Sequence, residues 1–225
     1  MEPDQSPAAK AIMGALHWLY ERVTASKLTT PMPTPGPGQG SEEHIESLIR
    51  WTAAQAGLVG FTTNLGGLIT LPFSLPANVA GVSALQLNMI TEIARARGYD
   101  LQSEQVKVLS IACLAGGAAL DILKNADVNV STRLTQRALT GIAGAALGRI
   151  NQAVGARRLT ARAGGLGLLN VSKFVPFVGG LVGGTVDGLA TAGIAAVAKR
   201  VFVRKEDAGP GEEAPVLSLP SPAVS

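Results

Sequence analysis

The order of apolar and polar residues along the chain predicts helices throughout. Over residues 8–28 and 103–124, apolar side chains recur three or four positions apart and therefore share one helix face. The first face carries Ile12, Leu16, Leu19 and Val23, and the second carries Val106, Leu109, Cys113, Leu114 and Leu120. No segment alternates with the period of two that a half-buried strand needs. We therefore expect an all-α protein, a single compact bundle of roughly six to eight helices.

Two long apolar stretches interrupted by glycine and proline are predicted to form helical hairpins. No charged residue lies in 51–91, and Gly66-Gly67, Pro72 and Pro76 predict two helices around a bend. The second of these helices is expected to run from about Pro76 to Arg97 and to stop at Gly98. The other stretch is 171–203, in which Asp187 is the only acid, and shorter basic helices are expected over 131–163.

Each stretch is long enough to interact with a bilayer, since a spanning helix needs about 20 apolar residues. Glycines four residues apart, such as Gly180 and Gly184, favour close helix packing. The pattern leaves three alternatives open: partial insertion of the hairpins, burial of the hairpins in a soluble bundle, and a true span.

Turn residues and charge divide the chain into four parts. Ser41 is a good helix cap, and Glu42 and Glu43 suit the positive end of the helix dipole, so a new helix is expected to start there. The parts are an N-terminal amphipathic helix in 1–28, a Pro/Gly linker in 29–40, a helical domain in 41–205 and an acidic, Pro/Ser-rich tail in 206–225 that is expected to be disordered.

Composition and charge narrow the class of protein. Of the 225 residues 47% are hydrophobic, 16% are charged and 4% are aromatic, with one cysteine, which excludes a mainly disordered chain and a disulfide scaffold. The net charge of +3 hides an asymmetry, because 128–205 holds eleven basic residues and one acid, a net +10, which leaves −7 elsewhere. A basic apolar segment suits an anionic membrane surface. Nucleic acid is an unlikely partner because stacking aromatics are scarce.

Candidate catalytic and metal-binding groups are sparse. The two histidines, His17 and His44, flank the linker and have no second ligand at metal-binding spacing, so no metal and no cofactor are expected. A hydrolase that uses buried acids remains an alternative, with Asp100, Asp121 and Asp187 as the candidate functional acids. Ion pairs are the favoured explanation, because Asp121 and Lys124 lie three residues apart on an expected helix and Asp187 has many arginines available to it. Whether the chain is an enzyme is therefore uncertain, and it is expected to be non-catalytic.

Several stretches, in order, resemble the EcsC family of bacterial proteins. The similarity covers about residues 42–203 and includes SLIRWTAAQAG (47–57), GFTTNLGGLITLPFSLPANVAGV (60–82), ARARGYDLQSEQVKVLSIACLAG (94–116), DILKNADV (121–128), GRINQAVGARRLTARAG (148–164), KFVPFVGGLVGGTVDG (173–188) and AAVAKRVF (195–202). The family is named for a gene beside the two components of an ABC transporter. The resemblance implies a helical, membrane-associated companion protein. The linker departs from the family pattern, so residues 8–28 could pack on the core or act as a separate membrane anchor.

The leading hypothesis is a protein on the cytoplasmic face of the inner membrane, peripheral or partly inserted. The residues expected to contact the membrane are Leu68, Ile69, Leu71, Phe73, Phe174, Val175 and Phe177. Those expected to hold anionic lipid head groups are Arg157, Arg158, Lys173, Lys199 and Arg200. The alternative partner is an integral membrane protein, with the chain as an adaptor or accessory factor of an ABC transporter.

Overall fold

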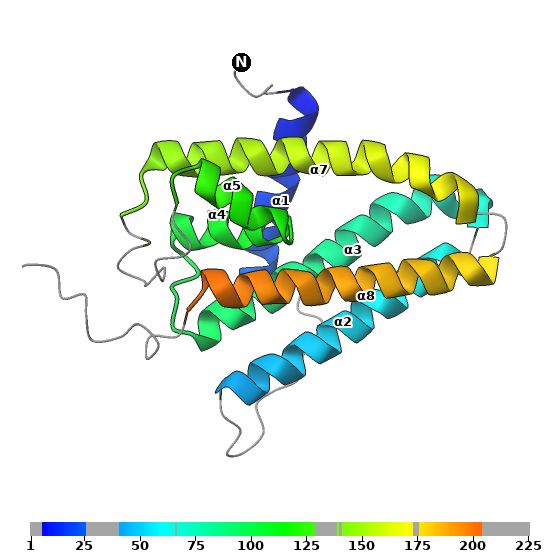
Figure 1. Cartoon of the computed structure of the whole chain (residues 1–225), viewed down its shortest axis with the longest axis horizontal. Coiled ribbons are helices and arrows are strands. Elements are labelled where there is room, and N and C mark those ends of the chain that lie inside the picture. Colours follow the sequence, from blue (N-terminus) through cyan, green and yellow to red (C-terminus); the bar gives the residue numbers. More distant parts are fainter. Residues whose placement is uncertain are drawn as a thin grey trace, which may run out of the picture.

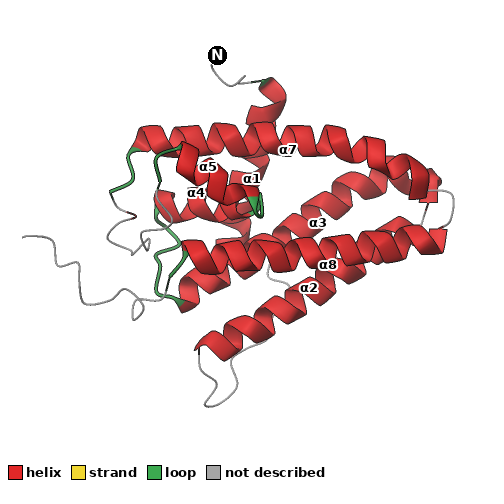
Figure 2. Ribbon diagram, viewed as in Figure 1, coloured by secondary structure: helices red, strands yellow, loops and turns green. Residues whose placement is uncertain are grey.

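A computed structural model describes residues 6–25, 41–65, 67–128, 139, 141–172 and 176–203, apart from the side chains of 41, 60, 62–80 and 159–183. The helices in these ranges number seven and pack into one bundle, and the same ranges contain no strand (Figure 2). The prediction of an all-α bundle is thereby confirmed. The expected linker (29–40) and the expected tail (206–225) lie outside the described residues.

Two long helical hairpins span the length of the molecule. The first consists of α2 (Ser41–Leu65) and α3 (Gly67–Ala96), and the second consists of α7 (Gly144–Ser172) and α8 (Pro176–Val201). Figure 1 shows that α2 and α7 end, and α3 and α8 begin, at the same end of the long axis, at the right of the view. We call these four helix termini the hairpin end, and the opposite end of the molecule the core end.

Three shorter helices pack against the hairpins, namely α1 (Pro7–Thr24), α4 (Glu104–Cys113) and α5 (Ala118–Asn125). Helices α4 and α5 lie toward the core end, and α1 crosses α7 near the middle of the long axis (Figure 1). Each of five helices contributes a fully or almost fully buried side chain to one core, namely Tyr20, Ile93, Leu109, Leu123 and Ile150. Complete burial of a large apolar side chain stabilises a fold by about 1.5–3 kcal/mol. Helix α1 is therefore part of the bundle, which decides between the two roles left open for this segment.

Local sequence signals account for several helix ends. Helix α1 begins after Ser6, whose hydroxyl accepts a hydrogen bond from the amide of Ala9 at 3.2 Å, with Pro7 at the first helical position. The last residue of helix α3 is Ala96, and the turn that follows is closed by Gly98, whose φ of +82° is left-handed. The amide of Tyr99 then donates to the carbonyl of Ala94 at 3.0 Å, as in a Schellman motif. The predicted stop at Gly98 is confirmed.

Three other boundaries differ from the expected ones. Helix α3 begins at Gly67 and runs through Pro72 and Pro76, because a proline removes one backbone hydrogen bond while the rest of the helix ladder continues. The helix expected over 103–124 is divided into α4 and α5 near Gly116, which has a φ of +60°. Instead of several short basic helices, α7 forms one helix of 29 residues.

Candidate functional site

The two hairpins are joined along α2 and α8, which run antiparallel in a fixed register. Glu42 at the start of α2 pairs with Lys199 near the end of α8, at 3.3 Å. Fifteen residues further along α2, Gly57 meets Gly184, which lies fifteen residues back along α8. This register holds the last turns of α2 beside the first turns of α8 and so brings the two expected bends to one end of the molecule.

Two glycines allow the backbones of α2 and α8 to touch. A Cβ atom on Gly184 would lie 2.7 Å from the carbonyl oxygen of Gly57, and a Cβ atom on Gly57 would lie 3.0 Å from the carbonyl oxygen of Gly184. One turn further along α8, a Cβ atom on Gly188 would lie 3.3 Å from the carbonyl oxygen of Ala53. The glycines spaced four residues apart on α8 therefore pack against the partner helix, as small residues do at close helix crossings.

The exposed face of α2 changes from charged to apolar toward the hairpin end. Glu43, Arg50, Ala54 and Leu58 are all exposed, and Leu58 keeps 56% of its surface accessible. Positions 50, 54 and 58 are four residues apart and therefore share one stripe of the helix. Along this stripe, charge is confined to the half of α2 that lies toward the core end.

Helix α8 shows the same change in the opposite chain direction. Arg200 at the core end is exposed, followed by exposed Ala196 and then by Leu189 and Val186, which are 75% and 57% exposed. Large apolar side chains with more than half of their surface exposed are uncommon in the part of the chain that the structure describes. Besides Leu189 and Val186, they are Leu58 on α2 and Trp18 on α1. Three of the four therefore lie on the paired helices α2 and α8.

The absence of charge extends to all four helix termini at the hairpin end. The sequence has no Asp, Glu, Lys or Arg in 51–65 of α2, 67–91 of α3, 163–172 of α7 or 176–186 of α8. The expected membrane-contact residues belong to this region by position: Leu68, Ile69, Leu71 and Phe73 are in the first turns of α3, and Phe177 is in the first turn of α8. Their side chains, and residues Phe174 and Val175, lie outside the described part of the structure.

The expected lipid-binding basic residues are not gathered in one place. Arg157 is exposed on α7, whereas the half-buried Arg158 donates a hydrogen bond to the carbonyl of Leu114 at 3.1 Å. Lys199 and Arg200 are near the last turn of α8, at the core end, about 35 Å of helix from Pro176. Lys173 lies outside the described residues.

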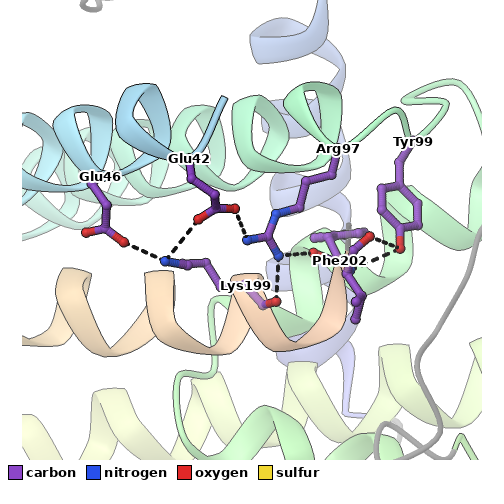
Figure 3. Close-up of polar contacts among 7 residues, drawn as sticks. Glu42, Glu46, Arg97, Tyr99, Lys199 and Phe202 are labelled. Carbon is purple, nitrogen blue, oxygen red and sulfur yellow. Dashed lines mark hydrogen bonds and ion pairs between the residues drawn. The ribbon is translucent and has the colours of Figure 1, made fainter. Parts of the chain in front are cut away.

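Lys199 instead belongs to a polar cluster that ties three helices together at the core end (Figure 3). We call this cluster the clasp; it comprises Glu42, Glu46, Arg97, Tyr99, Lys199 and the backbone of Phe202 and Val203. The guanidinium of Arg97 donates to Glu42 at 2.5 Å, to the carbonyl of Lys199 at 2.7 Å and to the carbonyl of Phe202. Its side chain is only 7% exposed, so it caps the end of α8 from within the bundle.

The charges and hydrogen bonds of the clasp shift the pKa values of Glu42 and Lys199. Partial burial of Glu42 opposes ionisation, but the hydrogen bond and charge of Arg97, together with Lys199, hold the pKa of this carboxyl below its usual value. The hydrogen bond to Glu46 raises the pKa of Lys199. The partners of Arg97 are 55 to 105 residues away in the sequence. No local pattern could therefore identify the clasp.

The three candidate acids belong to different parts of the fold. Asp100 is exposed after α3 and accepts a hydrogen bond from the amide of Gln102 at 2.9 Å, while Asp121 is exposed on α5. Asp187 is half-buried in the middle of α8. Among the described residues, no group of three His, Cys, Asp or Glu side chains could hold a metal ion.

Cys113 is buried in the core at the end of α4, where burial raises the pKa of its thiol to about 12. Within the described ranges, no helix is both long enough and apolar enough to cross a membrane. Comparisons of the chain with protein-family models, with curated proteins and with solved structures find no match.

Proposed function

We propose that this chain is a non-catalytic, EcsC-like peripheral membrane protein that binds an anionic bilayer through its hairpin end. The observation that carries the proposal is the separation of charge along the molecule. The termini of four helices at one end lack charged residues, while the ion pairs between described residues lie toward the other end. A bilayer has the same order of environments, with an apolar interior below a charged surface.

Exposed apolar side chains support contact with an apolar partner. Leu58, Val186 and Leu189 expose more than half of their surface in water. Transfer of such a side chain to an apolar environment is worth about 1–2 kcal/mol for the exposed part. All three lie on the paired helices α2 and α8, and exposed apolar surface is the kind of surface that binds an apolar partner.

Basic side chains supply the attraction to an anionic surface. Arg50 on α2 and Arg157 on α7 are exposed. Both lie toward the core end of their helices, beyond the segments that have no charged residue. Each Arg or Lys near an anionic membrane contributes about 1 kcal/mol to binding. The EcsC-like stretches and the single buried thiol of Cys113, which needs no oxidising compartment, favour the cytoplasmic face of the inner membrane.

Co-sedimentation of the full-length chain with lipid vesicles tests the proposal. We expect the chain to pellet with vesicles that contain phosphatidylglycerol, and to do so less with vesicles of phosphatidylcholine alone. Replacement of Leu58 and, separately, of Val186 by glutamine should lower the partition coefficient about tenfold for each residue, because each loses about 1.4 kcal/mol of apolar transfer.

Trp18→Gln is the matched control, since Trp18 is also 55% exposed but lies on α1. This variant should bind vesicles as the unmodified chain does. A chain that stays in the supernatant with both lipid compositions would contradict the proposal. So would a loss of binding in Trp18→Gln as large as that in the variants at positions 58 and 186, with helix content unchanged by circular dichroism.

A further inference from the structure

We infer that the protein inserts end-on into one leaflet of the bilayer, with its two hairpins forming a wedge. The first charged residues of the helices set the depth of insertion. This inference rests on the proposed function and adds the orientation and the depth of insertion. The alternative orientation is a molecule that lies flat, with the exposed faces of α2 and α8 along the membrane surface.

The length of helix without charge matches the thickness of one leaflet. Measured from the hairpin end, the first charged positions are Arg162 on α7, Asp187 on α8 and Arg50 on α2, which lie 10, 11 and 15 residues from the adjacent helix termini. At 1.5 Å per residue, these lengths correspond to about 15, 16 and 22 Å. One leaflet contributes about 15 Å of hydrocarbon and about 20–22 Å including head groups. The first charges therefore fall between the edge of the hydrocarbon and the head groups.

The long α3 does not contradict this limit. Its first charged residue, Glu92, lies 25 residues after Gly67, but 85–91 are buried in the bundle. Absence of charge there reflects packing within the protein core. The depth of the wedge is thus defined by α2, α7 and α8.

Charge complementarity favours the end-on orientation over the flat one. A flat molecule would press the exposed Glu43, which lies on the same stripe of α2 as Arg50, against anionic head groups. In the end-on orientation Glu43 is 22 residues, or about 33 Å, from Leu65 and so lies outside the bilayer. Arg50 and Arg157, each 15 residues from the end of its helix, then lie at head-group level.

One charge in the sequence opposes deep insertion. Lys173 falls between α7 and α8 in the sequence and lies outside the described residues. A lysine at the centre of a bilayer costs about 2.5–3.5 kcal/mol. Transfer of Leu58 and Val186, the exposed apolar side chains on the hairpin-end side of Arg50 and Asp187, offsets a cost of this size, at about 1–2 kcal/mol each.

A series of spin labels at successive positions along one stripe of α2 tests the orientation. Single cysteines at exposed positions, in Glu43→Cys, Arg50→Cys, Ala54→Cys and Leu58→Cys, would each carry a nitroxide in the full-length chain. The native Cys113 is buried and does not compete for the label. With vesicles of phosphatidylglycerol and phosphatidylcholine, collisions with oxygen and with a water-soluble nickel complex report the depth of each nitroxide.

We expect the label at 58 to lie about 12 Å deeper than the label at 50, and the label at 54 to lie midway, because each step of four residues is about 6 Å. The label at 43 should remain in water. Equal depths at 50 and 58 in protein that binds the vesicles would overturn the end-on orientation and leave membrane binding intact. Absence of vesicle binding by the unlabelled chain would overturn the proposed function itself.

Discussion

Substitution of Gly184 by alanine probes the contact that joins the two hairpins. The added Cβ atom would lie 2.7 Å from the carbonyl oxygen of Gly57, whereas ordinary van der Waals contact begins at 3.4 Å. Helices α2 and α8 would have to separate locally by about 0.7 Å, and a gap of this size forfeits a quarter to a half of the dispersion energy of the atoms involved.

Two opposing effects set the size of the change in stability. Alanine is a better helix former than glycine by about 1 kcal/mol. Overpacking of a tight interface costs about 1–3 kcal/mol. Because the obstacle here is backbone and cannot rotate away, we expect Gly184→Ala to lower the free energy of unfolding by about 1–2 kcal/mol.

Gly193→Ala provides the matched control on the same helix. Gly193 is exposed in α8, and a Cβ atom there would meet nothing within 4 Å, so this variant should gain about 0.5–1 kcal/mol from helix propensity alone. Thermal unfolding followed by circular dichroism should separate the two variants by about 3–12 °C in Tm, at about 2–4 °C per kcal/mol for a chain of this size. Equal Tm values would show that α2 and α8 do not approach as closely as the structure has them.

Three further predictions concern the core end. Glu42→Gln should lower the free energy of unfolding by about 1–2 kcal/mol at pH 7. That difference should shrink as the pH falls below 4.5 and through the lowered pKa of Glu42 in the folded state, because the carboxylate is then protonated. In the control Glu43→Gln, the free energy of unfolding from urea titrations should change little at pH 7 and at acidic pH. Tyr20→Phe should lower the free energy of unfolding by about 1 kcal/mol in a urea titration, because it removes the hydrogen bond that the Tyr20 hydroxyl donates to the carbonyl of Leu101 at 2.9 Å. Cys113 should react with a thiol reagent only in denaturant, and rapid reaction of the folded chain would contradict its burial.

Local signals in the sequence were sufficient for the class of fold and for several helix ends. The turn at Gly98 could be predicted because only a residue that tolerates positive φ ends a helix in this way. The sequence predicts a break in the helix at Pro72 and Pro76, whereas α3 continues through both. The difference arises because a proline affects one hydrogen bond, while the length of a helix depends on everything that packs along it.

The candidate site was only partly predictable. The charge-free segments and the spaced glycines were visible in the sequence, but the common position of the two hairpin ends depends on the register of α2 against α8. That register involves residues more than 120 positions apart, such as Gly57 and Gly184. The clasp around Arg97 depends on equally distant partners, so Lys199 could be read as a lipid ligand although it pairs with Glu42 and Glu46.

One measurement tests most directly the central claim that the hairpin end contacts the bilayer. An environment-sensitive fluorophore is attached to Val186→Cys and, separately, to Arg200→Cys, two exposed positions on α8 separated by about 21 Å of helix. On addition of phosphatidylglycerol vesicles, we predict a blue shift of the emission at position 186 and no shift at position 200. No shift at either position, or equal shifts at both, would contradict the account.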